Sequence, residues 1–391
     1  MRKTRQLAGF AFVVSLNQAH IVILIARIIN NSKLTTMKKT LSFAGGKKDF
    51  TNELRKKVGE YFSSMNISPT GNIKLYAKTI ILSLSLATIY YLLIFTPISF
   101  WFKAPLCIIF GLNIAGIGFN VMHDGGHGSY SKKKWVNKIM ALSLNLLGGN
   151  AYFWNLKHNV VHHTFTNLLG HDEDIEIPGM RISPEQKKRW MHKYQHHWWY
   201  WAPFYSTTYL LWVFLSDLRK YIKGKIVERK LQKMSLWQHF VFWISKAVYF
   251  TLLAVIPLYF LPFPAWFIGF LITMLSCGFT LSVVFQLAHV VPDASFPVPN
   301  DSGELDEEWT VHQISTTTDF ATDNKFISWF VGGLNFQIEH HLFPHISHVH
   351  YPAIRKIVME TCQKYGIKRV EYRTLPIALS AHVRHLKNMG K

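Results

Sequence analysis

Cysteine and acidic residues are both scarce in this sequence. Of its 391 residues only three are cysteine (Cys107, Cys277 and Cys362), and no two of them have the spacing of metal ligands. This scarcity excludes a disulfide framework and argues against a thiolate-bound zinc or iron–sulfur site. Asp and Glu number 22 against 43 Lys and Arg, which gives a net charge of +21. The basic residues fall in loops beside apolar runs, so the positive-inside rule explains them without a nucleic-acid partner.

Charge is also absent from three long apolar stretches. Residues 79–102 and 104–122 contain no charged residue, and the uncharged run 247–292 is long enough for two membrane helices. A membrane-spanning helix needs about 20 apolar residues. The sequence therefore predicts two helical hairpins, or four spans, with turns near Pro97 and at Pro262–Pro264.

The loop between the two predicted hairpins, roughly 128–240, is rich in lysine and arginine. This bias places the loop in the cytoplasm, and with it the inner ends of all four spans. Two apolar patches within the loop, 139–147 and 198–214, are short or interrupted, and the second is rich in Trp and Tyr. We expect both to be interfacial helices, with a fifth span as the alternative for the second.

Three clusters rich in histidine fall on the predicted cytoplasmic face of these spans. They are His123 and His127; His158, His162 and His163; and Gln337, His340 and His341. On an α-helix, residues four apart share a face, whereas His163 would lie about 100° around the helix from its neighbour His162. Neutral imidazole binds iron, zinc, copper and nickel, and a pair with an offset third can serve two neighbouring ions. Surface histidines on an amphipathic helix would explain one such cluster, but three favour a shared metal site.

With this spacing around two hydrophobic hairpins, the clusters resemble the histidine boxes of the membrane fatty-acid desaturase family. Residues 158–167 and 336–344 carry the most specific part of the resemblance, which covers about residues 74–365. Gln337 is similar to the residue that opens the third box of front-end acyl desaturases, which insert a double bond between an existing one and the carboxyl end. The implied fold is an all-α membrane protein with two transmembrane hairpins, interfacial helices and a cytoplasmic helical cap that carries a di-iron site.

The resemblance also implies the cofactors and the ligands. The site would be a non-heme di-iron centre that uses O2 as co-substrate, and a lone histidine at the end of the fourth span, His289, would add a ligand. The implied metal and catalytic set is His123, His127, His158, His162, His163, His289, Gln337, His340 and His341. Neutral ligands leave the charge of two ferrous ions uncompensated, so we expect carboxylates to hold the outer ring nitrogens of the ligands. The candidates are Asp124, Asp172, Asp174 and Glu339.

The expected activity is insertion of a cis double bond into a long-chain acyl group carried by CoA or by a lipid, with delta-6/delta-5-like or linoleoyl-CoA desaturase-like specificity. Lys157 and the basic run 187–189 are candidates for binding a CoA phosphate or an anionic lipid head. The sequence has no His-Pro-Gly-Gly heme motif of a fused cytochrome b5 domain. Electrons would therefore come from a separate protein of the ferredoxin or cytochrome b5 type.

Other activities fit parts of the same pattern. Sphingolipid-type desaturases also open the third box with Gln, and membrane di-iron hydroxylases acting on alkanes, sterols or carotenoids use similar boxes. A metal transporter is a distant alternative, because it would place its polar ligands in the middle of the spans.

The remaining segments carry weaker signals. Residues 1–36 are either a signal-like or extra membrane segment or lie upstream of a true start at Met37, and we favour the second interpretation. Residues 37–73 are expected to be a basic soluble segment with an amphipathic helix over 50–62, and 366–391 a basic cytoplasmic tail. Among the other histidines, we expect His345, His348 and His350 at the surface and consider His312 as a support for the metal site.

Overall fold

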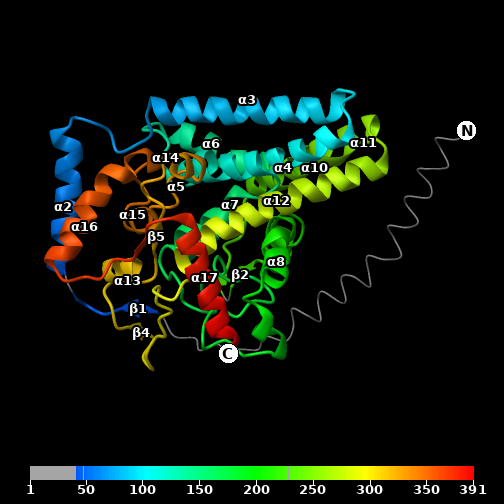
Figure 1. Ribbon diagram of the computed structural model, residues 1–391. Helices are drawn as coiled ribbons and strands as arrows, with labels where there is room; N and C mark the ends of the chain where they lie inside the picture. Colours follow the sequence, from blue (N-terminus) through cyan, green and yellow to red (C-terminus); the bar gives the residue numbers. More distant parts are fainter. Residues whose placement is uncertain (1–40, 47, 228) are drawn as a thin grey trace, which may run out of the picture. The chain divides into compact units, whose positions relative to one another are not determined.

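The computed structural model describes residues 41–391 apart from 47 and 228, and these form a mostly helical body (Figure 1). The interpretations of residues 1–36 lie outside the described residues. Three short strand pairs add to the predicted all-helical fold. They are β1 (Ser42–Phe43) with β4 (Glu304–Leu305), β2 (Lys225–Ile226) with β3 (Arg229–Lys230), and β5 (Asp319–Phe320) with β6 (Glu371–Tyr372). The first and third pairs are parallel and join segments that are far apart in the sequence.

Within the described residues, four helices are long and apolar enough to cross a membrane, and they form the two predicted hairpins. They are α3 (Ile73–Phe95); Phe100–His127, which comprises α4 (Phe100–Ile117), η1 (Gly118–Met122) and α5 (His123–His127); Leu236–Phe260, which comprises α10 (Leu236–Phe250), η5 (Thr251–Val255) and α11 (Ile256–Phe260); and α12 (Phe263–His289). The chain is therefore an integral membrane protein.

Both hairpin turns lie at the same end of these helices. The rings of Phe95 and Phe260, one beside each turn, have their centroids 4.8 Å apart. The third span begins at Leu236 and not near 247, as the absence of charge predicted. Lys246 does not interrupt this helix because its amine donates to the carbonyls of Gly148, at 2.5 Å, and Val213, at 2.9 Å.

Small residues let the spans approach one another closely. A methyl group added at Gly111 of α4 would lie 2.5 Å from the Thr273 carbonyl of α12. The helix α12 also packs against α8 (Trp198–Leu211), where a methyl group at Gly278 would collide with the Ser206 carbonyl. Glycine at these contacts permits van der Waals packing between backbones, which is the main attraction between helices in lipid.

Both apolar patches of the middle loop lie on helices. In α6 (Lys134–Leu146), the apolar residues Trp135, Ile139, Leu142 and Leu146 form an exposed stripe at helical spacing, as an interfacial helix would present to lipid. The helix α8 continues through η4 (Trp212–Ser216) into α9 (Asp217–Lys223), and none of this helix is among the four candidate spans of the described chain.

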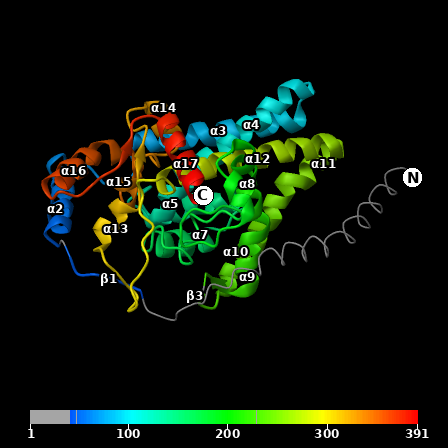
Figure 2. The ribbon, with the colours of Figure 1, turned by 60° about the horizontal axis from the view of Figure 1, so that its bottom comes forward.

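The opposite end of the spans carries a cap of shorter helices. Its members are α2 (Lys48–Ser64), α7 (Ala151–Asn155), η2 (Leu156–His162), η3 (Trp190–Tyr194), α13 (Trp309–Ser315), α14 (Lys325–Phe330), α15 (Gln337–Leu342), η6 (His348–His350), α16 (Tyr351–Lys364) and α17 (Leu375–Gly390). Figures 1 and 2 both show α2, α13, α15 and α16 gathered at this end. The amphipathic helix predicted over 50–62 is confirmed as α2, which buries Phe50, Leu54, Val58 and Phe62.

Candidate metal centre

The three histidine clusters meet at the end of the spans that faces the cap. The first comes from α5, the second from η2 and its end, and the third from α15, while His289 is the last residue of α12. Eight of the nine predicted residues are buried, and His127 is partly buried. Elements that are more than 200 residues apart in the sequence thus present their imidazoles to one volume.

The nitrogens fall into two groups that share no residue. In one, the ligand atoms of His123, His127, His158 and His340 lie within 4.8 Å of one another. In the other, those of His162, His289 and His341 meet the same limit. A further group joins His163 to both His340 and His341, so His163 lies between the two. This is the arrangement of donors that two neighbouring ions require.

The amide of Gln337 lies beside the second group. Its Nε2 atom is 3.0 Å from Nε2 of His289 and 3.3 Å from Nε2 of His341. Gln337 Oε1 is buried and has no hydrogen-bond partner among the described residues. The amide is therefore close enough to these imidazoles to act with them on one ion.

The second cluster lies on a π-helix and not on the regular α-helix assumed from the sequence. In η2 the amide of His163 donates to the carbonyl of His158, at 3.0 Å, a bond between residues five apart. The wider turn brings His158, His162 and His163 toward the same side, and Nε2 of His163 lies 3.3 Å from Nε2 of His158. A single π-helical turn is a frequent feature of functional sites. A second π-helical segment, η1, comes directly before His123.

Five of the imidazoles are anchored through Nδ1, which turns Nε2 toward the centre. The Nδ1 partners are Asp174 Oδ2 for His158 (2.9 Å), Asp172 Oδ2 for His162 (2.8 Å), the Thr316 carbonyl for His289 (3.3 Å), the Tyr351 hydroxyl for His340 (3.1 Å) and Gln313 Oε1 for His341 (2.8 Å). Hydrogen bonds of this kind fix the tautomer and orientation of a metal-binding histidine.

The protonation of the site suits metal binding. Burial, together with the neighbouring imidazoles, holds the pKa values of His163, His340 and His341 well below the usual range. These rings are therefore neutral, the form that binds metals. Burial raises the pKa of Asp174, but Lys157 and His158 outweigh this effect and hold that pKa well below its usual value. Asp174 is thus an anion beside the site.

Two of the four carboxylates proposed to support the histidines have other partners. Asp124 accepts from Ser347 Oγ at 2.6 Å, and its other oxygen lies 3.0 Å from Nδ1 of His348. Glu339 points away from the imidazoles, with Oε1 3.7 Å from the Arg369 guanidinium. Burial and the adjacent Asp319 raise the pKa of Glu339 well above its usual value. Glu339 therefore belongs to a buried cluster with Asp319 and Arg369, and it does not hold a ring of the site.

Several expectations for the neighbouring residues were wrong. His348 and His350, expected at the surface, are buried, and only His345 is exposed. Lys157, a candidate for binding a phosphate, instead forms an ion pair with Asp174. It thereby supports the carboxylate that holds His158, and its side chain is only 16% exposed.

Sequence reasoning missed Gln313 and Tyr351, which hold His341 and His340. His312 was considered as a support for the site, but the supporting residue is its neighbour Gln313. The Oε1 atom of Gln313 also accepts from the Thr166 hydroxyl, at 2.9 Å. The buried polar run after Trp309 was a signal for a supporting segment, but no local pattern distinguishes Gln313 from His312. Tyr351 gave no signal, since its contact depends on how α16 packs against α15.

The residues present fit metal ions. Nε2 of His123, His127, His162 and His340 is buried and has no hydrogen-bond partner within the described part of the chain. A buried polar atom without a partner costs about 1–3 kcal/mol, so four of them at one place indicate a missing common partner. A donor set of imidazole nitrogens and one amide, without a thiolate, suits iron among other metals of the first transition series.

Comparison with known proteins gives one consistent result. A family model described as Fatty acid desaturase matches residues 99–373. The sn-1 linoleoyl-lipid 6-desaturase of Arthrospira platensis is 38% identical over 91% of this chain and 96% of its own length. The corresponding enzyme of a Synechocystis species is 32% identical over 88% of this chain and 96% of its own length. The acyl-lipid (8-3)-desaturase of Physcomitrium patens is 36% identical over 90% of this chain and 74% of its own length.

Proposed function

This chain belongs to the fatty acid desaturase family, and from that membership we propose that it is a front-end desaturase of acyl chains carried by membrane lipids. The observation that carries the proposal is the cluster of imidazoles whose outer nitrogens are anchored and whose inner nitrogens face one another. The front-end specificity and the lipid-bound substrate are supported by the names of the similar proteins from Arthrospira platensis and Physcomitrium patens.

Each group of donors is proposed to hold one iron ion. His123, His127, His158 and His340 would hold the first, and His162, His289 and His341 the second, with Gln337 beside the second and His163 between them. Iron at these positions would supply the oxidising power that removal of hydrogen from an unactivated methylene requires, which no acidic or basic side chain can supply. Asp172 and Asp174 add negative charge through the rings of His162 and His158.

The other side chains determine what reaches the metals. Phe285 packs against His162, with ring centroids 5.1 Å apart, and Trp154 stacks on His158 at 4.6 Å. These aromatic walls exclude water and suit an aliphatic chain. Regiospecificity then becomes a matter of positioning, because one methylene must be held against the metals.

The site is proposed to face the cytoplasm and to receive electrons there. Residues 128–235, which connect the hairpins at this end, carry the basic excess that the positive-inside rule assigns to the cytoplasm. A separate electron-transfer protein of the ferredoxin or cytochrome b5 type is the proposed reductant. Its docking side would then be the cap, which is the part of the body outside the membrane.

The proposal is tested by expressing the full chain in a host that lacks polyunsaturated lipids and supplying 18-carbon acids. Mass spectrometry of the lipids should locate a new double bond on the carboxyl side of an existing one. A His340→Ala/His341→Ala variant at equal expression should form none and should lose iron. Iron-loaded protein that forms no new product from any supplied acid would contradict the proposal, and a hydroxylated product would identify a hydroxylase instead.

A further inference from the structure

A cavity of about 550 Å³ lies in the cap between α2 and the segment that follows the third histidine box. Val58 and Phe62 of α2 face Leu342 and Trp309 across it. Such a volume is within the range of about 300–1,000 Å³ that small-molecule sites occupy, and a mostly apolar wall with few polar groups is typical of them. The cavity, here called the α2 cavity, is not part of the histidine cluster.

Two walls of the α2 cavity belong to the residues that build the metal centre. Leu342 directly follows His341, and the indole of Trp309 donates to the carbonyl of His163 at 3.2 Å. The cavity therefore shares part of its wall with the segments that carry His163 and His341. Pro69, also in the lining, comes four residues before α3 enters the membrane, so the cavity lies near the level from which a lipid could reach it.

The polar groups of the α2 cavity are basic. His345 is exposed at its edge, and Arg55 is exposed on α2. The neighbouring Lys56 and Lys57 pair with Glu60 and Glu53, but Arg55 has no ion-pair partner within the described part of the chain. A free guanidinium beside an apolar wall suits a ligand with oxygen acceptors at one end and a hydrocarbon chain at the other.

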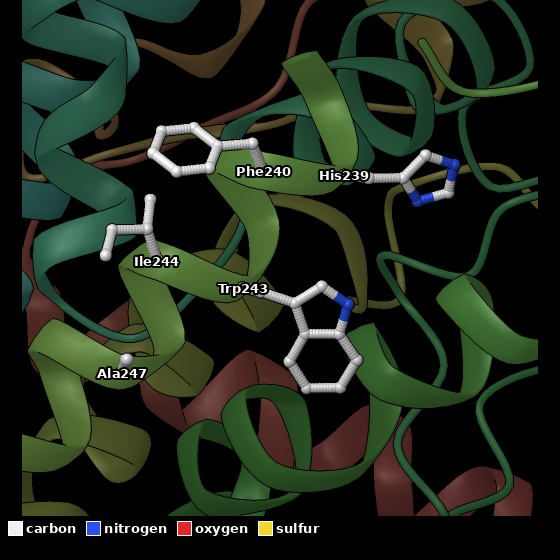
Figure 3. Close-up of a pocket in the computed structure, with 5 residues that line it drawn as sticks. All are labelled: His239, Phe240, Trp243, Ile244 and Ala247. Atoms are coloured by element: carbon white, nitrogen blue, oxygen red, sulfur yellow. The ribbon is translucent and has the colours of Figure 1, made fainter. Parts of the chain in front are cut away.

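Another hollow is less suited to this role. A depression of about 420 Å³ is lined by His239, Phe240, Trp243, Ile244 and Ala247, which are drawn in Figure 3. All five residues come from α10, which is one of the proposed membrane spans. Lipid tails cover such a surface in any membrane protein, so the depression needs no specific ligand.

The reaction itself requires a site for the carboxyl end close to the metals. The relative from Arthrospira platensis is named a 6-desaturase, which counts the reacting carbon from the carboxyl carbon. About five carbon–carbon bonds of about 1.5 Å each separate the two carbons, so the ester lies within about 8 Å of the reacting methylene. If this chain has the front-end activity proposed above, it needs an ester site next to the histidine boxes.

We propose that the α2 cavity is this site, and that it holds the carboxyl-end segment of the lipid-bound acyl chain. Val58, Phe62, Trp309 and Leu342 contact the first methylenes, and Arg55 donates to the ester oxygens. The inference rests on the proposed function. It adds the residues that determine how far from the carboxyl carbon the double bond forms.

Gly59 offers a direct test because it lines the α2 cavity and an added Cβ would meet no atom within 4 Å. Gly59→Phe places a ring in the cavity without a clash at the helix, whereas Gly59→Ala adds only a methyl group and raises helix propensity. With the iron-loaded full chain and vesicles of dilinoleoyl phosphatidylglycerol, we expect Gly59→Phe to raise KM about tenfold, far more than Gly59→Ala does. Iron content should be the same in both variants, and neither should be less stable to heat than the wild type.

Arg55→Gln provides the second arm, with Lys56→Gln as a control for loss of one positive charge from the same helix. Loss of a hydrogen bond from a charged donor to the ester should raise KM about tenfold for Arg55→Gln. The rise should be equal for dilinoleoyl phosphatidylglycerol and for a dilinoleoyl galactolipid, because both carry the same ester. An effect confined to the phosphate-containing lipid would overturn the assignment of Arg55 to the ester.

Three other outcomes would overturn the inference. The first is an active wild-type enzyme whose KM for lipid is unchanged by both Gly59→Phe and Arg55→Gln. The second is a rise in KM for the electron-donor protein with none for lipid, which would make the α2 cavity part of the donor surface. The third is a wild-type enzyme that forms no double bond, and this result alone would also remove the proposed function.

Discussion

Asp124 and His348 lie 224 positions apart in the chain, yet a carboxylate oxygen of one is 3.0 Å from Nδ1 of the other. Asp124 follows His123, and His348 comes shortly after His340 and His341, so the contact joins the first and third histidine boxes. Nε2 of His348 in turn lies 3.0 Å from the amine of Lys78 on α3. One carboxylate thus connects two boxes and, through an imidazole, a membrane helix.

Asp124→Asn should therefore weaken the whole site and not one ligand. The change replaces a buried carboxylate that contacts Nδ1 of His348 with a neutral amide, and a hydrogen bond to a charged group contributes about 1.5–3 kcal/mol. We expect a marked fall in the thermal unfolding temperature of the detergent-solubilised protein and a loss of iron. Asp301→Asn, at an exposed position, is the matched control and should change neither. An Asp124→Asn protein as stable as the control would show that the contact does not join the boxes.

Asp172→Asn tests the carboxylates that hold the metal-binding rings. Asp172 accepts from Nδ1 of His162 and also from the backbone amide of Asn167, at 3.0 Å. Asn keeps an acceptor oxygen but removes the negative charge behind His162, and mutation of such a partner typically weakens metal binding 10–100-fold. We expect iron to leave the variant at a correspondingly lower chelator concentration, measured by elemental analysis after dialysis. Asp306→Asn is the exposed control, and full iron content and turnover in Asp172→Asn would remove this residue from the site.

The histidine boxes could be predicted from the sequence because their residue types and spacing are local. Three long uncharged runs likewise predicted the four spans, because length and the absence of charge indicate a membrane helix, although the early start of the third span at Leu236 was missed. The π-helical turn at Leu156–His162 could not be predicted, because its hydrogen bonds differ from those of an α-helix by only one residue. The burial of His348 depends on Asp124 and Lys78, which are remote in the sequence.

Gln313 is the clearest case of a residue that only the fold could reveal, and it allows a conservative test. Its Oε1 atom is 2.8 Å from Nδ1 of His341. Gln313→Leu should remove the acceptor and weaken iron retention 10–100-fold, as expected for loss of such a partner. Gln313→Glu keeps an oxygen at nearly the same place and should retain more iron than Gln313→Leu. Equal loss in both variants would mean that Gln313 acts through packing alone.

Gln337→Ala should affect one ion more than the other. The amide lies beside His289 and His341 of the second group, while His123, His127, His158 and His340 of the first belong to a separate set of donors. We expect the iron content to fall toward one ion per chain, measured by elemental analysis against protein concentration. Uniform loss of both ions would contradict two separable groups of ligands.

Asp217 allows a test by pH at a distance from the histidines. It is fully buried and accepts from the Trp212 indole at 3.1 Å, and burial raises its pKa to about 6, although Lys246 and Lys220 oppose the shift. The folded protein therefore holds a proton here that the unfolded chain, with an ordinary Asp pKa near 4, releases earlier. Between pH 4 and 6 the native state binds more protons at this group, so its contribution to stability falls as the pH rises.

Asp217→Asn abolishes this titration and should gain stability relative to the wild type as the pH is raised from about 4 to about 6. A shift of two pK units corresponds to a change on the order of 3 kcal/mol in that difference, and above pH 6 the difference should be constant. Thermal unfolding of both proteins at a series of pH values measures it, since every other titrating group is common to the two. A difference that stays flat across this range would mean that Asp217 is ionised throughout, with Lys246 compensating its charge in full.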